Sequence, residues 1–78
     1  MRGFGELESA IMDVVWSRAE PATVREVLEA LAGERDSAYT TVMTVMNILH
    51  RKGWLDRERA GRAWRYRPAM TREAYAAR

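Results

Sequence analysis

Hydroxyl, amide and basic side chains are concentrated on one side of the segment 38–52, where the spacing of apolar residues predicts a helix. Threonine is a poor helix former, so a helix face that repeats it needs another reason for doing so. A DNA major groove supplies one, because hydroxyl and amide groups hydrogen-bond base edges, methyl groups contact thymine, and asparagine can pair bidentately with adenine. Basic residues at the end of the segment can reach phosphates. The predicted DNA-contacting residues are Thr40, Thr41, Met43, Thr44, Asn47, Arg51 and Lys52.

Arginines recur in the segment 54–67, which has the pattern of a β-hairpin. Trp64 and Tyr66 alternate with other residues at period two, and a turn that contains Gly61 separates them from the preceding run. A basic hairpin, or wing, beside a reading helix can contact the flanking DNA backbone or the minor groove, and such contacts position a protein rather than specify a sequence. The predicted wing contacts are Arg59, Arg62 at the turn, and Arg65.

Two other functions would use the same surfaces. The threonine-rich face could contact a partner protein, in which case nucleic-acid binding would depend little on salt. Trp64 and Tyr66 could stack on the bases of a single strand. We favour packing for both rings, and for Trp16 and Trp54, because a chain of 78 residues needs its aromatic side chains in its core. Double-stranded DNA is therefore the preferred partner.

Residues that could support catalysis are scarce. The chain has no cysteine, which excludes disulfides, thiolate metal ligands and cysteine nucleophiles. His50 is the single histidine, and its place near a helix end is typical of a structural or surface residue. Zinc-protease, nucleophile-elbow and phosphate-loop motifs are missing. We therefore expect no enzyme, no metal and no cofactor.

Length and hydropathy indicate a single small folded domain. The 78 residues, of which 47% are hydrophobic, suffice for one domain with a thin core. No segment approaches the ~20 apolar residues of a membrane span, and the first residues lack the apolar run of a signal peptide. We expect a cytoplasmic protein that does not contact a membrane.

The net charge of +2 is unevenly distributed along the chain. Residues 1–50 carry four arginines and eight acidic residues, a charge of −4, whereas residues 51–78 carry eight arginines, one lysine and three acidic residues, a charge of +6. Such an asymmetry is typical of a protein with one face for a polyanion, although a solvated arginine-rich surface would give the same count.

Apolar residues recur at helical spacing in three segments, 6–19, 24–32 and 38–52. The predicted buried stripes are Leu7, Ile11, Val14 and Val15 in the first, Val24, Val27, Leu28 and Leu31 in the second, and Ala38, Val42, Val45, Met46 and Leu49 in the third. With the hairpin they predict a mainly α fold with a small β-hairpin: a winged helix-turn-helix of three helices plus a wing, over residues 1–70. A further helix is expected to begin within residues 71–78.

Capping signals mark the ends of these helices. Thr23 and Glu26 have the spacing of a capping box, in which each side chain bonds the other residue's backbone N–H. Ser37 or Asp36 is expected to cap the third helix. Gly33 and Gly53 are expected to end the second and third helices.

The segments resemble those of the penicillinase-repressor family of winged-helix regulators. AYTTVMTVM at 38–46 with LHRKG at 49–53 resembles the family's recognition helix. ELE at 6–8 and MDVVW at 12–16 resemble its first helix, TVREV at 23–27 its second, and GRAWRY at 61–66 its wing. The resemblance implies reading positions at Thr40, Thr41, Met43, Thr44 and Asn47, and a wing contact at Arg62.

The resemblance also implies a repressor that binds a DNA operator of dyad symmetry as a homodimer and blocks transcription of β-lactamase or related resistance genes. Family members continue into a helical dimerisation domain, so residues 71–78 are expected to lead into one, and the 78 residues alone are expected to be monomeric. Asn47 and Ile48 stand where members often carry an acidic or polar residue followed by arginine, which indicates a different base preference.

Overall fold

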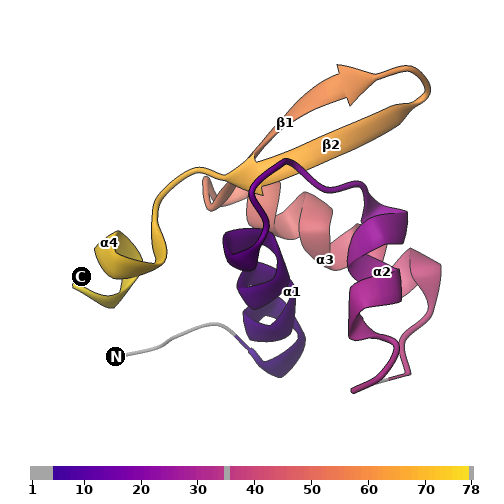
Figure 1. The fold of residues 1–78 in the computed structure, drawn as a ribbon, viewed down its shortest axis with the longest axis horizontal. Coiled ribbons are helices and arrows are strands. Elements are labelled where there is room, and N and C mark those ends of the chain that lie inside the picture. The colour runs from indigo at the N-terminus through magenta and orange to yellow at the C-terminus, as the bar shows by residue number, and fades with distance from the viewer. Residues whose placement is uncertain (1–4, 35, 78) are drawn as a thin grey trace.

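The computed structural model describes residues 5–34 and 36–77. The elements in chain order are the helices α1 (Glu6–Ser17), α2 (Val24–Leu31) and α3 (Tyr39–Arg51), the strands β1 (Leu55–Ala60) and β2 (Ala63–Pro68), and the helix α4 (Arg72–Ala76) (Figure 1). This confirms the predicted winged helix-turn-helix with its small hairpin. Residues 1–4, 35 and 78, which the predicted ranges 1–70 and 71–78 include, lie outside the described residues.

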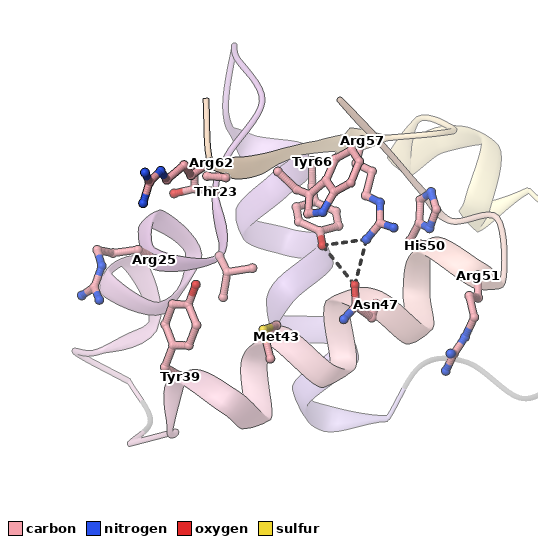
Figure 2. Close-up of a pocket in the computed structure, with 13 residues that line it drawn as sticks. Thr23, Arg25, Tyr39, Met43, Asn47, His50, Arg51, Arg57, Arg62 and Tyr66 are labelled. Atoms are coloured by element: carbon pink, nitrogen blue, oxygen red, sulfur yellow. Dashed lines mark hydrogen bonds between the residues drawn. The ribbon is translucent and has the colours of Figure 1, made fainter. Parts of the chain in front are cut away.

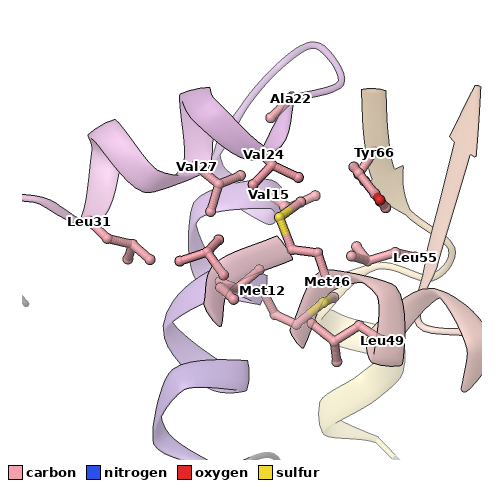
Figure 3. Packing of buried hydrophobic residues seen from close by; sticks show 12 residues of the cluster. Met12, Val15, Ala22, Val24, Val27, Leu31, Met46, Leu49, Leu55 and Tyr66 are labelled. Carbon is pink, nitrogen blue, oxygen red and sulfur yellow. The ribbon is translucent and has the colours of Figure 1, made fainter. Parts of the chain in front are cut away.

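The core lies where the three long helices meet the inner face of the hairpin (Figure 3). The buried side chains are Ile11, Met12, Val15, Ala22, Val24, Val27, Leu31, Val42, Met46, Leu49, Leu55 and Tyr66. Leu7, Val14, Leu28 and Val45, which the helical spacing also assigned to the core, are only partly buried and pack against its edge. No helix in the described part of the chain is long and apolar enough to cross a membrane.

The start of α2 is fixed by the predicted capping box. Thr23 Oγ1 accepts a hydrogen bond from the Glu26 N–H at 3.1 Å, and Glu26 Oε1 accepts one from the Thr23 N–H at 2.9 Å. The backbone bond from Thr23, helped by the nearby guanidinium of Arg18, lowers the pKa of Glu26 below its ordinary value. The box therefore holds an ionised carboxylate at the positive end of the helix.

Three of the predicted helix ends are wrong. The first helix ends at Ser17 rather than 19. Ala38 is the N-cap of α3, with extended backbone and no side-chain cap, so neither Ser37 nor Asp36 caps it and Ala38 is exposed rather than buried. The second helix ends at Leu31, with Ala32 as its C-cap. Gly33 does not have the positive φ of a glycine cap and lies instead in a turn at 32–34. Gly53, with φ 86°, does end α3 as predicted.

The hairpin register divides its side chains between two faces. Arg57 pairs with Tyr66 and Arg59 with Trp64, so these four side chains share the face that looks toward the helices. Gly61, with φ 66°, and Arg62 form the turn. On its other edge β2 is held by the chain before α2, through two backbone hydrogen bonds of 2.8 Å between Tyr66 and Ala22.

The short helix α4 packs against the back of α1 and the start of the hairpin. The Tyr75 ring lies 5.7 Å from the Trp16 ring and 5.1 Å from the Trp54 ring, between centroids. Trp16 Nε1 donates to the Met70 carbonyl at 2.9 Å. Trp16 and Trp54, which were expected in the core, are only partly buried and pack against its edge.

Truncation of a core side chain of α3 should destabilise the domain far more than truncation on its outer face. Met46 is fully buried, so Met46→Ala is expected to lower the free energy of unfolding by about 2–5 kcal/mol. Thr44→Ala, in the same helix but exposed, should change it by no more than about 0.5 kcal/mol. Urea denaturation followed by circular dichroism measures both, and equal losses would contradict this description of the core.

Candidate nucleic-acid interface

A cleft of about 750 Å³ opens between α3, the start of α2 and the inner face of the hairpin (Figure 2). Tyr39, Met43, Asn47 and His50 lie three or four residues apart, so one side of α3 forms the floor of the cleft. The described lining includes Arg25, Arg51, Arg57 and Arg62 and no carboxylate. The cleft is therefore a positively charged concavity beside an exposed helix face.

The helical repeat of about 3.6 residues separates the predicted reading residues into groups. Thr40, Thr44 and Arg51 lie opposite the buried stripe of α3, and all three are exposed. Met43 and Asn47 lie between this outermost line and the wing, within the cleft.

Thr41 and Lys52 lie on the edge of α3 away from the wing. Thr41 is exposed, and neither residue lines the cleft. Lys52 Nζ is 3.6 Å from Glu8 Oε2, so its charge is directed toward α1. These two residues are therefore less central to the exposed surface than the other predicted reading residues.

Asn47, Arg57 and Tyr66 form a triangle of hydrogen bonds between α3 and the hairpin (Figure 2). Arg57 Nη1 donates to Asn47 Oδ1 at 2.9 Å and to Tyr66 Oη at 3.3 Å. Tyr66 Oη in turn donates to Asn47 Oδ1 at 3.2 Å. The Arg57 guanidinium also lies over the Trp64 ring, with Cζ 4.3 Å from the centroid. This triangle, called here the Asn47 triangle, connects α3 to the wing.

The three predicted wing arginines have different surroundings. Arg62 lies at the turn and lines the cleft. Arg59 Cζ is 4.9 Å from the Trp64 ring centroid, on the face that looks toward the cleft. Arg65 points from the opposite face of β2, where Nη2 donates to the Pro21 carbonyl at 3.4 Å and lies 3.9 Å from Glu20 Oε1. The structure therefore separates Arg65 from the other two.

Sequence reasoning missed Arg57, Arg25 and Tyr39. Arg57 could have been found, because alternation along the first strand places it on the same side as Arg59. Arg25 Cζ lies 5.5 Å from the ring centroid of Tyr39, and the pair forms the α2 end of the cleft. No local pattern signals this pair, since its members belong to different helices.

The fold and the cleft define the class as a winged-helix domain with a basic concavity beside its third helix. The chain belongs to the penicillinase repressor family, whose family model matches residues 4–78. It is 54% identical over 69 residues to the transcriptional regulator BlaI of Mycobacterium tuberculosis, in strains CDC 1551 and H37Rv. That match covers 88% of this chain and 50% of the relative, so the chain spans about half the length of these relatives.

Two solved structures share the fold. The solution structure of the DNA-binding domain of the repressor BlaI superposes with a TM-score of 0.79 at 24% identity, covering 96% of this chain and 94% of that one. The solution structure of the monomeric form of Bacillus licheniformis BlaI in complex with the blaP half-operator has a TM-score of 0.74 at 24% identity, covering 95% and 89%. At this identity both confirm the winged-helix fold.

Removal of the Tyr66 hydroxyl should weaken the connection between wing and helix. Tyr66→Phe is expected to lower the free energy of unfolding by about 0.5–1.5 kcal/mol, because Asn47 Oδ1 then keeps only its bond from Arg57. Tyr39→Phe is the matched control, since that ring is 41% exposed, and its effect should stay within about 0.5 kcal/mol. Chemical denaturation of both variants compares them, and equal effects would show that the hydroxyl of Tyr66 contributes nothing.

Proposed function

We propose that this domain binds double-stranded DNA in a sequence-specific manner, with α3 in the major groove and the wing over the flanking backbone. The observation that carries the proposal is the basic cleft, whose described lining has no carboxylate, beside an exposed line of threonines. A helix with short polar side chains can approach base edges closely, and surrounding arginines can neutralise phosphates.

The exposed line of α3 supports a division between reading and positioning residues. Thr40 and Thr44 are exposed, with Met43 and Asn47 beside them on the wing side, and we propose that they meet base edges. Arginines that line the cleft can contact phosphates and so fix the register of the helix on the duplex. We assign that positioning role to Arg25, Arg51 and Arg62.

The remaining predicted contacts require a rearrangement or a lesser role. Lys52 would have to leave Glu8, and Arg65 would have to leave Glu20 and Pro21, before either reached a phosphate. Each pair has one well-exposed member, Lys52 in the first and Glu20 in the second, so we expect the cost of separating them to be modest. Thr41 and Arg59 would contact DNA at the edges of the interface.

We further propose that the protein acts as a transcriptional repressor that occupies an operator and excludes the polymerase. The relatives named transcriptional regulator and the neighbour solved with a half-operator support this proposal. A half-operator implies an operator with dyad symmetry, so we propose a homodimer of the full-length protein, formed by a domain that follows residues 71–78. β-Lactamase or related resistance genes are the proposed targets, and the cytoplasm the proposed location.

Substitutions on α3 and on the wing should affect binding differently. Thr44→Ala is expected to cost about 1–3 kcal/mol on the preferred duplex and to relax specificity, whereas Arg62→Ala should weaken all duplexes alike and lower the salt slope by about one. Fluorescence anisotropy with a TACA/TGTA-type dyad, which the family resemblance suggests, and a scrambled duplex at two salt concentrations measures both effects. Equal binding of the two duplexes by the unsubstituted protein, lost with salt, would contradict specific recognition.

The 78 residues alone should be mainly monomeric and should bind one half-site weakly. A single module of this kind buries about 600–1,000 Å² on DNA. Tight binding needs two copies on half-sites about one helical turn, ~34–36 Å, apart. Sedimentation equilibrium of the free protein tests the first statement, and a tight dimer at micromolar concentration would overturn it.

A further inference from the structure

The amide oxygen of Asn47 is already fully used within the protein. A side-chain carbonyl oxygen has two lone pairs, and those of Asn47 Oδ1 accept from Arg57 and from Tyr66. The orientation of the amide is not arbitrary, because arginine can only donate and therefore requires the oxygen. The amide nitrogen lies on the other side of the group, away from Tyr66 (Figure 2).

Arg57 is itself held in place by the hairpin. Its side chain is half-buried, and its guanidinium lies over the Trp64 ring while bonding Tyr66 Oη at 3.3 Å. A guanidinium that is fixed by an aromatic face and by a buried tyrosine has little freedom to leave Asn47. The oxygen of Asn47 is therefore committed before any ligand arrives.

We infer that Arg57 is a positioning residue that fixes the Asn47 amide, so that Asn47 meets base edges through Nδ2 alone, as a hydrogen-bond donor. This inference rests on the proposed function, since it presumes that α3 enters the major groove. It replaces the bidentate pairing with adenine expected from the sequence, because that pairing needs Oδ1 to accept from the adenine amino group.

A donor without an acceptor restricts the bases that Asn47 can favour. Guanine O6 and N7, adenine N7 and thymine O4 are acceptors on the major-groove edge and suit Nδ2. The exocyclic amino groups of adenine and cytosine are donors and gain nothing from it. Asn47 thus contributes a preference for an acceptor at one position and is insensitive to an adenine amino group there.

The test begins with enrichment of a random duplex library by the wild-type domain and by Asn47→Ala, which identifies the base pair whose preference depends on Asn47. Analogues are then placed at that pair and affinities are measured by anisotropy. Replacement of a purine N7 by C–H, or of thymine O4 by hydrogen, should lower wild-type affinity by about fivefold or more, the equivalent of one hydrogen bond. Replacement of adenine by nebularine, which lacks the amino group, should change it less than twofold.

Other results of this experiment would overturn the inference. A fivefold loss with nebularine would show that Oδ1 accepts from adenine. The inference would also be overturned if the preference that depends on Asn47 were for a cytosine contacted through its amino group. It would be overturned as well if no base preference depended on Asn47. If the library yields no preferred sequence, the proposed function itself fails, which is a distinguishable outcome.

Two kinds of variant separate positioning from a merely structural role. Asn47→Asp keeps an acceptor for Arg57 and Tyr66 but has no donor, so it should melt at or above the wild-type temperature and yet lose the same base preference as Asn47→Ala. Its added negative charge weakens preferred and scrambled duplexes alike, so their ratio is the readout. Retention of the preference by Asn47→Asp would overturn the inference.

Arg57→Met should free the lone pair of Oδ1 that Arg57 occupies, while Tyr66 keeps the other, and this should make binding sensitive to nebularine where the wild type is not. Arg57→Lys, which can still donate to Oδ1, should restore the wild-type pattern. Arg67→Met is the matched control, because Arg67 is on the same hairpin but on the opposite face, 3.3 Å from Glu58. The inference fails if Arg57→Met and Arg67→Met give the same discrimination between analogues. Should Arg57→Met fail to fold, the wild-type and Asn47→Asp measurements decide alone.

Discussion

Tyr66 is the residue on which the geometry of the wing depends, because it is anchored through its backbone, its ring and its hydroxyl. Its N–H and C=O each form a 2.8 Å hydrogen bond with Ala22, its side chain is 1% exposed in the core, and its hydroxyl bonds Asn47 on α3. The wing cannot tilt relative to α3 without breaking at least one of these contacts. The width of the cleft is thereby set by the packing of the core rather than by a flexible loop.

The pairing register of β1 and β2 determines which charged side chains of the hairpin lack an acidic partner nearby among the described residues. On the face away from the helices, Arg67 lies 3.3 Å from Glu58, and Arg65 is drawn toward Glu20. On the cleft face, Arg57 and Arg59 lie over the Trp64 ring. Because strand side chains alternate, acidic and basic residues that look interspersed in the sequence are sorted onto two faces. The basic half of the chain therefore presents its uncompensated charge to one side, which is what electrostatic attraction of a polyanion requires.

The sequence was sufficient for the elements and most of the core, because helical spacing, the Thr23–Glu26 capping box and the Gly61 turn are local signals. It failed at three helix ends, and it missed contacts between residues that are far apart in the chain. Ala22 belongs to the core because the chain before α2 pairs with β2, and Met12 because α1 is covered on more than one side by α3 and the hairpin. The Asn47 triangle joins residues 10 and 19 positions apart from Asn47, so spacing along α3 could not reveal it.

Polar residues of α3 differ in how far they take part in holding the domain together. Thr44 is exposed and free to act on a ligand alone, whereas Asn47 bonds two residues of the hairpin and is half-buried. Truncation of Asn47 is therefore expected to change the free energy of unfolding as well as any base contact, and such effects are not additive. In a mutational scan of one helix face, a loss of binding can therefore reflect a lost ligand contact at one residue and a less stable fold at another. At Asn47 the contribution to binding can be separated from the contribution to stability only when the donor and acceptor atoms of the amide are altered independently.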